Sequence, residues 1–83
     1  MAIEIIDVNY DARWHGVNYL ALGEDVHPFS CLVPSEDLNL KVGDAAIAAF
    51  KTRFEDVRRA TEEVLGRETV GRLGTEIIII RLT

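Results

Sequence analysis

Residues 44–66 read DAAIAAFKTRFEDVRRATEEVLG and form the longest regular pattern in the chain. Its apolar residues recur every three or four positions, which places them on one stripe of a helix. The stripe comprises Ile47, Phe50, Phe54, Val57, Ala60 or Thr61, and Val64. Asp44 is typical of a helix N-cap, and Gly66 is typical of the glycine that closes a last turn. We therefore predict one helix of about six turns, roughly 30 Å long.

The opposite face of the predicted helix carries opposite charges four residues apart. The pairs are Lys51–Glu55, Glu55–Arg59, Arg58–Glu62 and Arg59–Glu63. Each exposed pair contributes only about 0.2–0.5 kcal/mol, so the helix must gain most of its stability by packing its apolar stripe. We expect Phe50→Ala or Phe54→Ala to be the most destabilising substitution in the chain, at about 3–5 kcal/mol.

Short β-branched and apolar runs predict strands on both sides of this helix. The expected strands cover residues 3–8, 15–22, 27–33 and 76–82, the last with four consecutive isoleucines. A turn is expected at residues 9–11, and Ser35 is expected to cap a single helical turn. The predicted fold class is α+β in two layers. A mainly antiparallel three- to four-stranded sheet, in the order β-β-β-α-β, carries one long helix on one face.

The loop at residues 23–26 is short enough for an antiparallel hairpin between the second and third strands. With four loop residues, Leu22 faces His27, Leu20 faces Phe29 and Asn18 faces Cys31. This register predicts that one face forms the core layer, made of Leu20, Leu22, Phe29, Cys31 and Val33.

The length and composition describe one small globular domain spanning residues 1–83, with 48% apolar and 28% charged residues. These fractions are ordinary for a folded protein. No apolar run approaches the roughly 18 residues of a membrane span, and the N-terminus lacks the pattern of a signal peptide. The single Cys31 cannot form an intrachain disulfide. We therefore expect a cytoplasmic protein that does not act at a membrane.

The net charge of −5 opposes binding to nucleic acid, since an acidic protein repels phosphate backbones. Residues 51–72 nevertheless hold six basic and five acidic residues. Arg53, Arg58 and Arg59 are the candidates for a local anion-binding face, with Arg67 and Arg72 as further members. The acidic neighbours on the same helix favour a solvated, salt-bridged face instead.

The isoleucine-rich strand is apolar on both sides, with Ile77 and Ile79 on one face and Ile78 and Ile80 on the other. One helix covers only one face of a small sheet. A second copy of the chain is the first candidate for covering the other face or edge. The alternative is that residues 67–74 or the N-terminal segment cover it.

No catalytic or metal-binding constellation is recognisable in the sequence. His27 and Cys31 would lie about 13 Å apart along a strand, and His15 lies at the far end of the hairpin. We interpret Cys31 as a small buried hydrophobe. The carboxylate pairs Asp7 with Asp11 and Glu24 with Asp25 are interpreted as solvated turn residues. No metal and no cofactor are expected.

Trp14 and His15 form the most distinctive polar–aromatic cluster. One interpretation is an exposed anchor for a partner, since tryptophan is enriched at binding hot spots. The interpretation we favour is that Trp14 closes one end of the core, because tryptophan is usually well buried.

The same residues carry a resemblance to a family. The segments Trp14-His15-Gly16-Val17-Asn18-Tyr19, Phe29-Ser30-Cys31, Ser35-Glu36 and Leu38 are similar to the front half of a small bacterial family, the domain of unknown function fourteen-eighty-eight. Ala49-Phe50-Lys51, Arg53, Val57 and Ala60 resemble its back half. The resemblance covers nearly the whole chain and implies a soluble bacterial protein of two-layer α+β build, with no established activity. The isoleucine-rich tail departs from the family pattern.

These observations predict a non-enzymatic binding or regulatory module, homodimeric, that acts through a protein partner. The candidate binding residues are Trp14, His15, Arg53, Arg58 and Arg59. Nucleic-acid binding through the arginine-bearing helix is the second hypothesis, and a small thiol or hydrolytic enzyme is the third.

Overall fold

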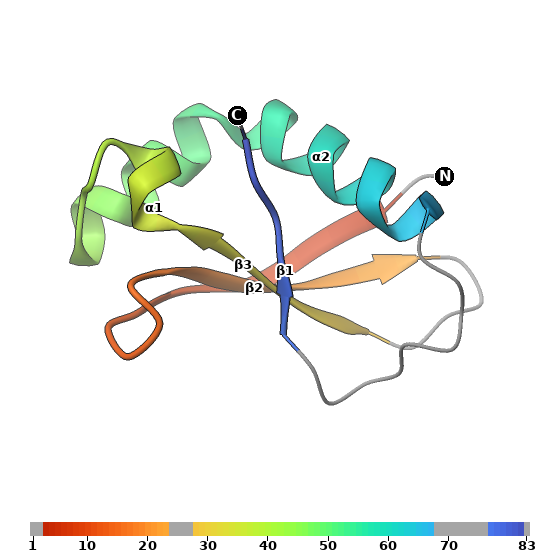
Figure 1. Cartoon of the computed structure of the whole chain (residues 1–83), viewed down its shortest axis with the longest axis horizontal. Helices are drawn as coiled ribbons and strands as arrows, with labels where there is room; N and C mark the ends of the chain where they lie inside the picture. Colours follow the sequence, from red (N-terminus) through yellow and green to blue (C-terminus); the bar gives the residue numbers. More distant parts are fainter. Residues whose placement is uncertain (1–2, 24–27, 68–76, 83) are drawn as a thin grey trace.

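The computed structural model describes residues 3–23, 28–67 and 77–82 (Figure 1). The elements in chain order are β1 (Ile3–Asp11), β2 (Gly16–Gly23), β3 (Phe29–Pro34), the 3₁₀ helix η1 (Ser35–Leu38), α1 (Gly43–Thr52), α2 (Phe54–Arg67) and β4 (Ile78–Ile79). The strands form one sheet in the order β1-β2-β3-β4. Both α-helices lie on the same side of this sheet (Figure 1). The predicted two-layer α+β class is confirmed.

The sheet is mixed. β1 pairs with β2 and β2 with β3 in antiparallel fashion, whereas β4 runs parallel to β3. β4 is also much shorter than the strand predicted for residues 76–82, because only Ile78 and Ile79 pair with β3. After them, the amide of Ile80 donates to the carbonyl of Leu32 at 2.8 Å. Ion pairing through Arg81, described below, holds the segment that follows.

The β2–β3 register differs by one residue from the prediction. Val17 faces Val33, Tyr19 faces Cys31 and Ala21 faces Phe29. Because side chains alternate across a strand, this slip exchanges the two faces of β2. The predicted core positions Leu20 and Leu22 were therefore wrong. The prediction depended on a four-residue loop, and residues 24–27, which include His27, lie outside the described residues.

β1 is longer than predicted, and the turn expected at residues 9–11 is wrong. The strand continues to Asp11 and the chain turns at residues 12–15. A register shift between Ile6 and Asn9 marks a β-bulge, in which Asp7 takes a left-handed φ of 54°. The bulge lets the strand run on past the polar residues that suggested a turn.

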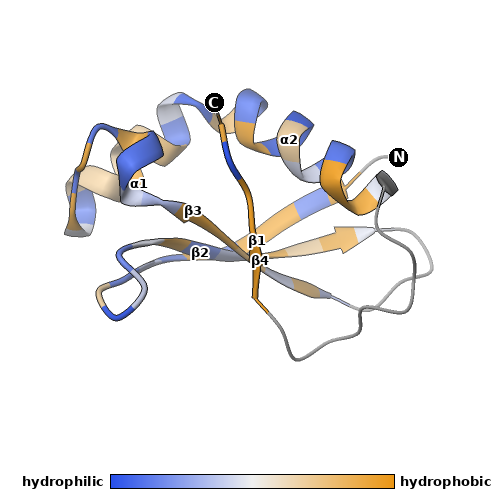
Figure 2. Ribbon diagram, viewed as in Figure 1, coloured by the Kyte–Doolittle hydropathy of each residue, from blue (hydrophilic) through white to orange (hydrophobic). Residues whose placement is uncertain are grey.

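The core lies between the sheet and the two helices, and its centre is aromatic. The ring centroids of Tyr19 and Phe50 are 5.3 Å apart, and those of Phe50 and Phe54 are 6.3 Å apart. Phe50 and Val57 have no exposed surface. Figure 2 shows that the hydrophilic residues of α2 lie on the side away from the sheet. The predicted apolar stripe therefore faces the core.

The predicted single long helix is wrong, because the chain leaves helical geometry at Arg53, between α1 and α2. Thr52 Oγ1 donates to the carbonyl of Ala48 at 3.0 Å, a back-bond that bends helices. The amide of Arg53 donates to the carbonyls of both Ala49 and Phe50 at 3.1 Å, as in a closing helical turn. α2 then begins at Phe54.

The predicted caps also differ from the structure. The residue that precedes α1 is Val42, with no capping side chain, and Asp44 lies within the first turn. Gly66 lies inside α2 rather than beyond its end. The predicted helical turn at Ser35 is confirmed as η1, but Pro34 occupies the N-cap position and Ser35 caps nothing. Local capping preference is therefore only a weak guide to where these helices begin and end.

Candidate functional site

The structure separates the five predicted binding residues into two places. Trp14 and His15 lie in the turn between β1 and β2. Arg53 lies at the bend between the helices, and Arg58 and Arg59 lie on α2.

The carboxylate of Asp11 organises the turn that carries Trp14. Its Oδ1 accepts hydrogen bonds from the amides of Arg13 at 2.9 Å and Trp14 at 3.2 Å. Its Oδ2 accepts from Asn18 Nδ2 at 3.1 Å. Asp11 is therefore a structural turn residue that holds the start of β2. It is more than the solvated carboxylate predicted from the sequence.

Trp14 is 50% exposed, so the favoured interpretation that it closes the core is wrong. Trp14 instead lines a depression of about 400 Å³. The other lining residues are His15, Pro34, Ser35, Glu36, Leu40 and Val42.

Leu40 and Val42 were not recognised as site residues from the sequence. They are 75% and 63% exposed, higher fractions than that of Trp14. Leu38, in the same segment, is 1% exposed and belongs to the core. The segment leaves the regular elements after η1, so no periodicity separates its inward from its outward residues. Residues 38–42 alternate apolar and polar side chains, a pattern that would place Leu38, Leu40 and Val42 on one side, whereas the structure buries Leu38 and exposes the other two.

The backbone around the depression is fixed in a sparsely populated conformation. His15, Asn39 and Leu40 have φ angles of 51°, 58° and 56°. A bulky side chain such as leucine rarely adopts this left-handed region. Two hydrogen bonds of 2.8 Å hold the arrangement, from the amide of Ser35 to the carbonyl of His15 and from the amide of Leu40 to the carbonyl of Ser35. The depression is therefore preformed.

Among the described residues, Glu36 supplies the only carboxylate that lines the depression. It lies 3.4 Å from Arg81, and both side chains are about half exposed, at 60% and 49%. Arg81 is held more firmly by Asp37, through hydrogen bonds of 2.8 and 3.1 Å. The Asp37 side chain is 3% exposed. It also accepts the amide of Leu82 at 3.0 Å. Hydrogen bonding from Arg81 lowers the pKa of Asp37, and the Leu82 amide acts in the same direction.

The depression also contains a polar atom without a partner. Ser35 is 8% exposed, and its Oγ is buried without a hydrogen-bond partner in the described structure. A buried hydroxyl normally finds a partner, so this position is one where a bound polar group can improve the local energy.

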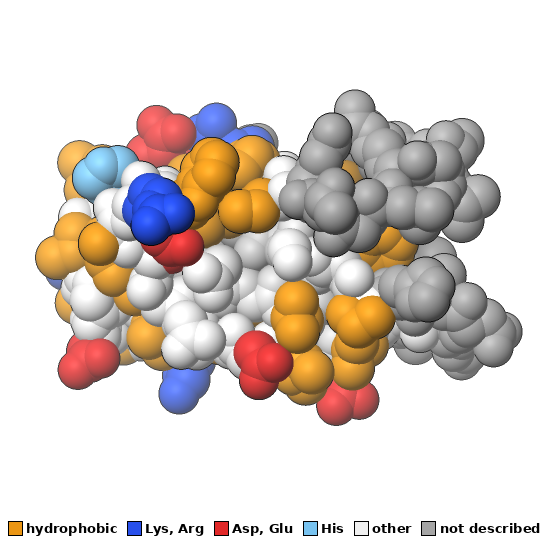
Figure 3. All heavy atoms as spheres, turned by 90° about the horizontal axis from the view of Figure 1, so that it is seen from below, with side chains coloured by type: hydrophobic (Ala, Val, Ile, Leu, Met, Phe, Trp, Pro, Cys, Tyr) orange, Lys and Arg blue, Asp and Glu red, His pale blue; other side chains and the backbone are white. Residues whose placement is uncertain are grey.

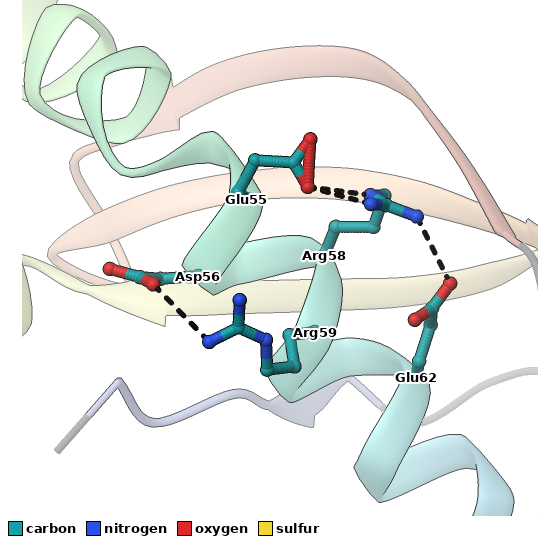
Figure 4. Close-up of polar contacts among 5 residues, drawn as sticks. All are labelled: Glu55, Asp56, Arg58, Arg59 and Glu62. Carbon is teal, nitrogen blue, oxygen red and sulfur yellow. Dashed lines mark hydrogen bonds and ion pairs between the residues drawn. The ribbon is translucent and has the colours of Figure 1, made fainter.

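The arginines of the helical face are paired with acids, as Figure 4 shows. Arg58 binds Glu55 at 2.6 Å and Glu62 at 3.5 Å. Arg59 lies 3.9 Å from Asp56. Hydrogen bonding to Glu55 raises the pKa of Arg58. The predicted Arg58–Glu62 pair is confirmed, whereas Glu55 pairs with Arg58 instead of with its predicted partners, four residues away in each direction.

Arg53 joins the helical face to η1. Its Nε lies 3.3 Å from Asp56, and its Nη1 donates to the main-chain carbonyl of Asp37 at 3.2 Å. Its guanidinium is therefore committed to contacts within the chain. The charges of this face balance locally, which favours the predicted salt-bridged surface over an anion-binding one.

The Cys31 thiol and the Tyr19 hydroxyl are buried. Cys31 has no exposed surface, and burial raises the pKa of its thiol to about 12, so it behaves as the small hydrophobe predicted from the sequence. Burial also raises the pKa of Tyr19, whose hydroxyl lies 2.6 Å from Thr61 Oγ1. Within residues 3–23, 28–67 and 77–82, His, Cys, Asp and Glu form no group of three that could hold a metal ion.

No family model, curated protein or solved structure matches the chain. The resemblance to the domain of unknown function fourteen-eighty-eight therefore stays a prediction. In the parts of the chain that the structure describes, no helix combines the length and apolar character needed to cross a membrane.

Proposed function

We propose that this chain is a non-enzymatic binding module that engages a partner protein through the depression beside Trp14. The observation that carries the proposal is the gathering of three exposed apolar side chains, Trp14, Leu40 and Val42, around a preformed hollow. Apolar groups left exposed together mark interaction sites. A tryptophan in such a place is a frequent hot spot, because it contributes a large apolar area at a low cost in conformational entropy.

A protein partner is supported over a nucleic acid by the charges. Arg53, Arg58 and Arg59 each already contact an acidic residue of α2, and Arg72 lies outside the described residues. The net charge of −5 repels a polyanion at long range. The same net charge favours the approach of cationic surfaces.

A selection from a random peptide phage library on the immobilised protein tests the proposal. Selected clones should bind wild type and lose binding to Leu40→Ser, which changes an exposed side chain and should leave the fold intact. Ile79→Ser is the matched control, since Ile79 is also an exposed apolar residue, at 44%, but does not line the depression. Clones that bind all three proteins equally, or that depend on Ile79 instead, would contradict the proposal.

The homodimer expected from the sequence stays a prediction. Figure 3 shows the sheet face away from the helices, where hydrophobic side chains occur in separate groups among polar ones. Ile79 is the most exposed large apolar residue of the strands. Sedimentation equilibrium should show a dimer that Ile79→Glu dissociates. A monomer at tens of micromolar would reject this prediction and would leave the proposed partner site untouched.

A further inference from the structure

We infer that the depression beside Trp14 binds a short segment of a partner protein in which a large apolar residue stands next to a lysine or arginine. The inference rests on the proposed function and names the chemistry of the ligand. Three features of the walls support it: their size, their charge and an unpartnered hydroxyl.

The size of the depression fits a short segment. Its volume of about 400 Å³ lies at the low end of the range of roughly 300–1,000 Å³ for ligand pockets. A hollow of this volume accepts one or two large side chains. A folded face, such as a second copy of the chain would present, needs about 800 Å² of contact per partner, which a hollow of this kind does not provide.

The charge of the walls favours a partner segment in which a lysine or arginine stands next to the apolar residue. Among the described residues that line the depression, Glu36 is the only acidic one and none is a lysine or arginine. Lys41, which lies between two lining residues in the sequence, is exposed but does not line the depression. The present partner of Glu36 is Arg81, at 3.4 Å. Arg81 keeps two hydrogen bonds to Asp37, so Glu36 can turn to an incoming cation without leaving Arg81 unpaired. The net charge of −5 assists the encounter with a basic segment.

Rotation of the Ser35 side chain, whose Oγ is buried, would bring its unpartnered hydroxyl to the main chain of a bound segment. Ser35 Oγ is buried without a hydrogen-bond partner, and Ser35 lines the depression. A hydroxyl can donate to a carbonyl or accept from an amide. A segment whose apolar side chain enters the depression brings both groups close to this wall.

Three blocked hexapeptides test the inference on the intact protein. Gly-Lys-Leu-Phe-Lys-Gly is the expected ligand, Gly-Glu-Leu-Phe-Glu-Gly reverses its charge, and Gly-Lys-Ala-Ala-Lys-Gly removes its apolar centre. Trp14 is the only tryptophan of the chain and lines the depression, so its fluorescence reports occupancy. The first peptide should shift the emission saturably. The glutamate peptide should bind more weakly, but only about tenfold, because an exposed charge contact contributes little free energy. The alanine peptide should not bind, because it has no large apolar side chain to enter the depression.

Two variants test whether the peptides bind at the residues that line the depression. Glu36→Gln should reduce the preference for the lysine peptide over the glutamate peptide about threefold, since it removes one exposed charge contact. Leu40→Ser should abolish binding of both. Thermal unfolding of each variant, unchanged from wild type, serves as the folding control.

The outcomes separate the inference from the function on which it rests. Equal binding of the lysine and glutamate peptides, both lost in Leu40→Ser, would overturn the charge preference and leave the proposed function standing. No shift of Trp14 with the lysine peptide at millimolar concentration would also overturn the inference. The proposed function then fails as well only if the phage selection yields no clones that depend on Leu40. An emission shift on concentrating the protein alone, absent in Leu40→Ser, would make a second copy the occupant.

Discussion

The helix-covered face of the sheet and the depression beside Trp14 are both built from large apolar side chains, but only the first is closed. Phe50 and Val57 have no exposed surface, whereas Trp14 is 50% and Leu40 75% exposed. The closed region consists of strand and helix residues, whose regular spacing directs side chains to a common core. The open region is built from the turn between β1 and β2, from η1 and from the segment before α1, and two of its lining residues, His15 and Leu40, have left-handed φ angles. The same residue types therefore stabilise the fold in one region and stay available to a partner in the other.

The largest expected contrast is between Phe50→Ala and Trp14→Ala. Phe50 contacts two aromatic rings in the closed region, so its truncation leaves a cavity and should cost about 3–5 kcal/mol. Truncation of the half-exposed Trp14 should cost less than about 1 kcal/mol, as for most surface substitutions. Urea denaturation of the two variants measures both. Similar losses of stability in the two variants would show that Trp14 is packed as tightly as Phe50 and that the depression is not an open region.

The next effect concerns η1, which belongs to both regions because Glu36 lines the depression and Leu38 enters the core. Asp37→Asn removes the buried charge that binds Arg81 and should cost about 1–3 kcal/mol, toward the lower end because Arg81 is half exposed. Arg81→Gln is the companion variant. Denaturation at neutral pH should show that the two changes are not additive, since they break one contact.

The same contact predicts a dependence on pH. Hydrogen bonding from Arg81 lowers the pKa of Asp37 in the folded protein, so the unfolded chain takes up this proton first as the pH falls. The contribution of Asp37 is fully present above the ordinary aspartate pKa of about 3.9 and is lost as the pH falls through the lower folded value. Wild type should lose this stability between about pH 5 and pH 2, and Asp37→Asn should lose less. Parallel pH profiles would contradict the assignment.

A smaller effect tests the polar centre of the closed region. Thr61 Oγ1 donates to the carbonyl of Val57 at 2.7 Å, so it accepts the hydrogen bond from the Tyr19 hydroxyl. Tyr19→Phe leaves Thr61 with its own acceptor and should cost about 1 kcal/mol. Thr61→Val removes the acceptor of the buried Tyr19 hydroxyl and should cost more, about 1–3 kcal/mol of stability. The reverse order, measured by denaturation, would show that the Tyr19 hydroxyl has another partner.

The smallest expected effect is an increase in stability on substitution of Gly66. Gly66 lies within α2, is exposed, and a Cβ there would meet nothing within 4 Å. Gly66→Ala should therefore raise the free energy of unfolding by about 0.5–1 kcal/mol, because alanine loses less backbone entropy in a helix. Gly43→Ala is the control, since Gly43 has a φ of 58° that disfavours a side chain. A loss of stability in Gly66→Ala would place the end of α2 before this residue.

The regular elements were largely predictable from the sequence, because their apolar residues recur with a helical or a strand period. Phe50 and Val57 were placed in the core by spacing alone, and the structure confirms both. The register of β2 and β3 was not predictable. It depends on a loop length that the alternation of apolar residues does not fix, and both faces of β2 are apolar enough to suit either register. The break at Arg53 leaves no mark on the hydrophobic pattern, and the Thr52 back-bond does not explain it alone, since Thr61 makes the same bond to Val57 within the continuous α2.

The candidate site was predicted in part. Trp14 and His15 were singled out, but general burial statistics favoured a core position for Trp14, whereas the Asp11-capped turn leaves it at the surface. Leu40 and Val42 were missed because side chains in irregular segments have no period from which to read their direction. Their exposure depends on the left-handed backbone at Asn39 and Leu40, which local sequence preferences do not predict for leucine.

The most direct test of the central claim is the exposure of Trp14 in the free protein. Because Trp14 is the only tryptophan, its emission and its quenching by acrylamide report on this side chain alone. An exposed Trp14 should give emission close to that of tryptophan in water and efficient quenching, little changed in Ile79→Glu. Emission typical of a buried indole, with weak quenching, would show that the depression is already closed in the free protein and that Trp14 is not available to a partner.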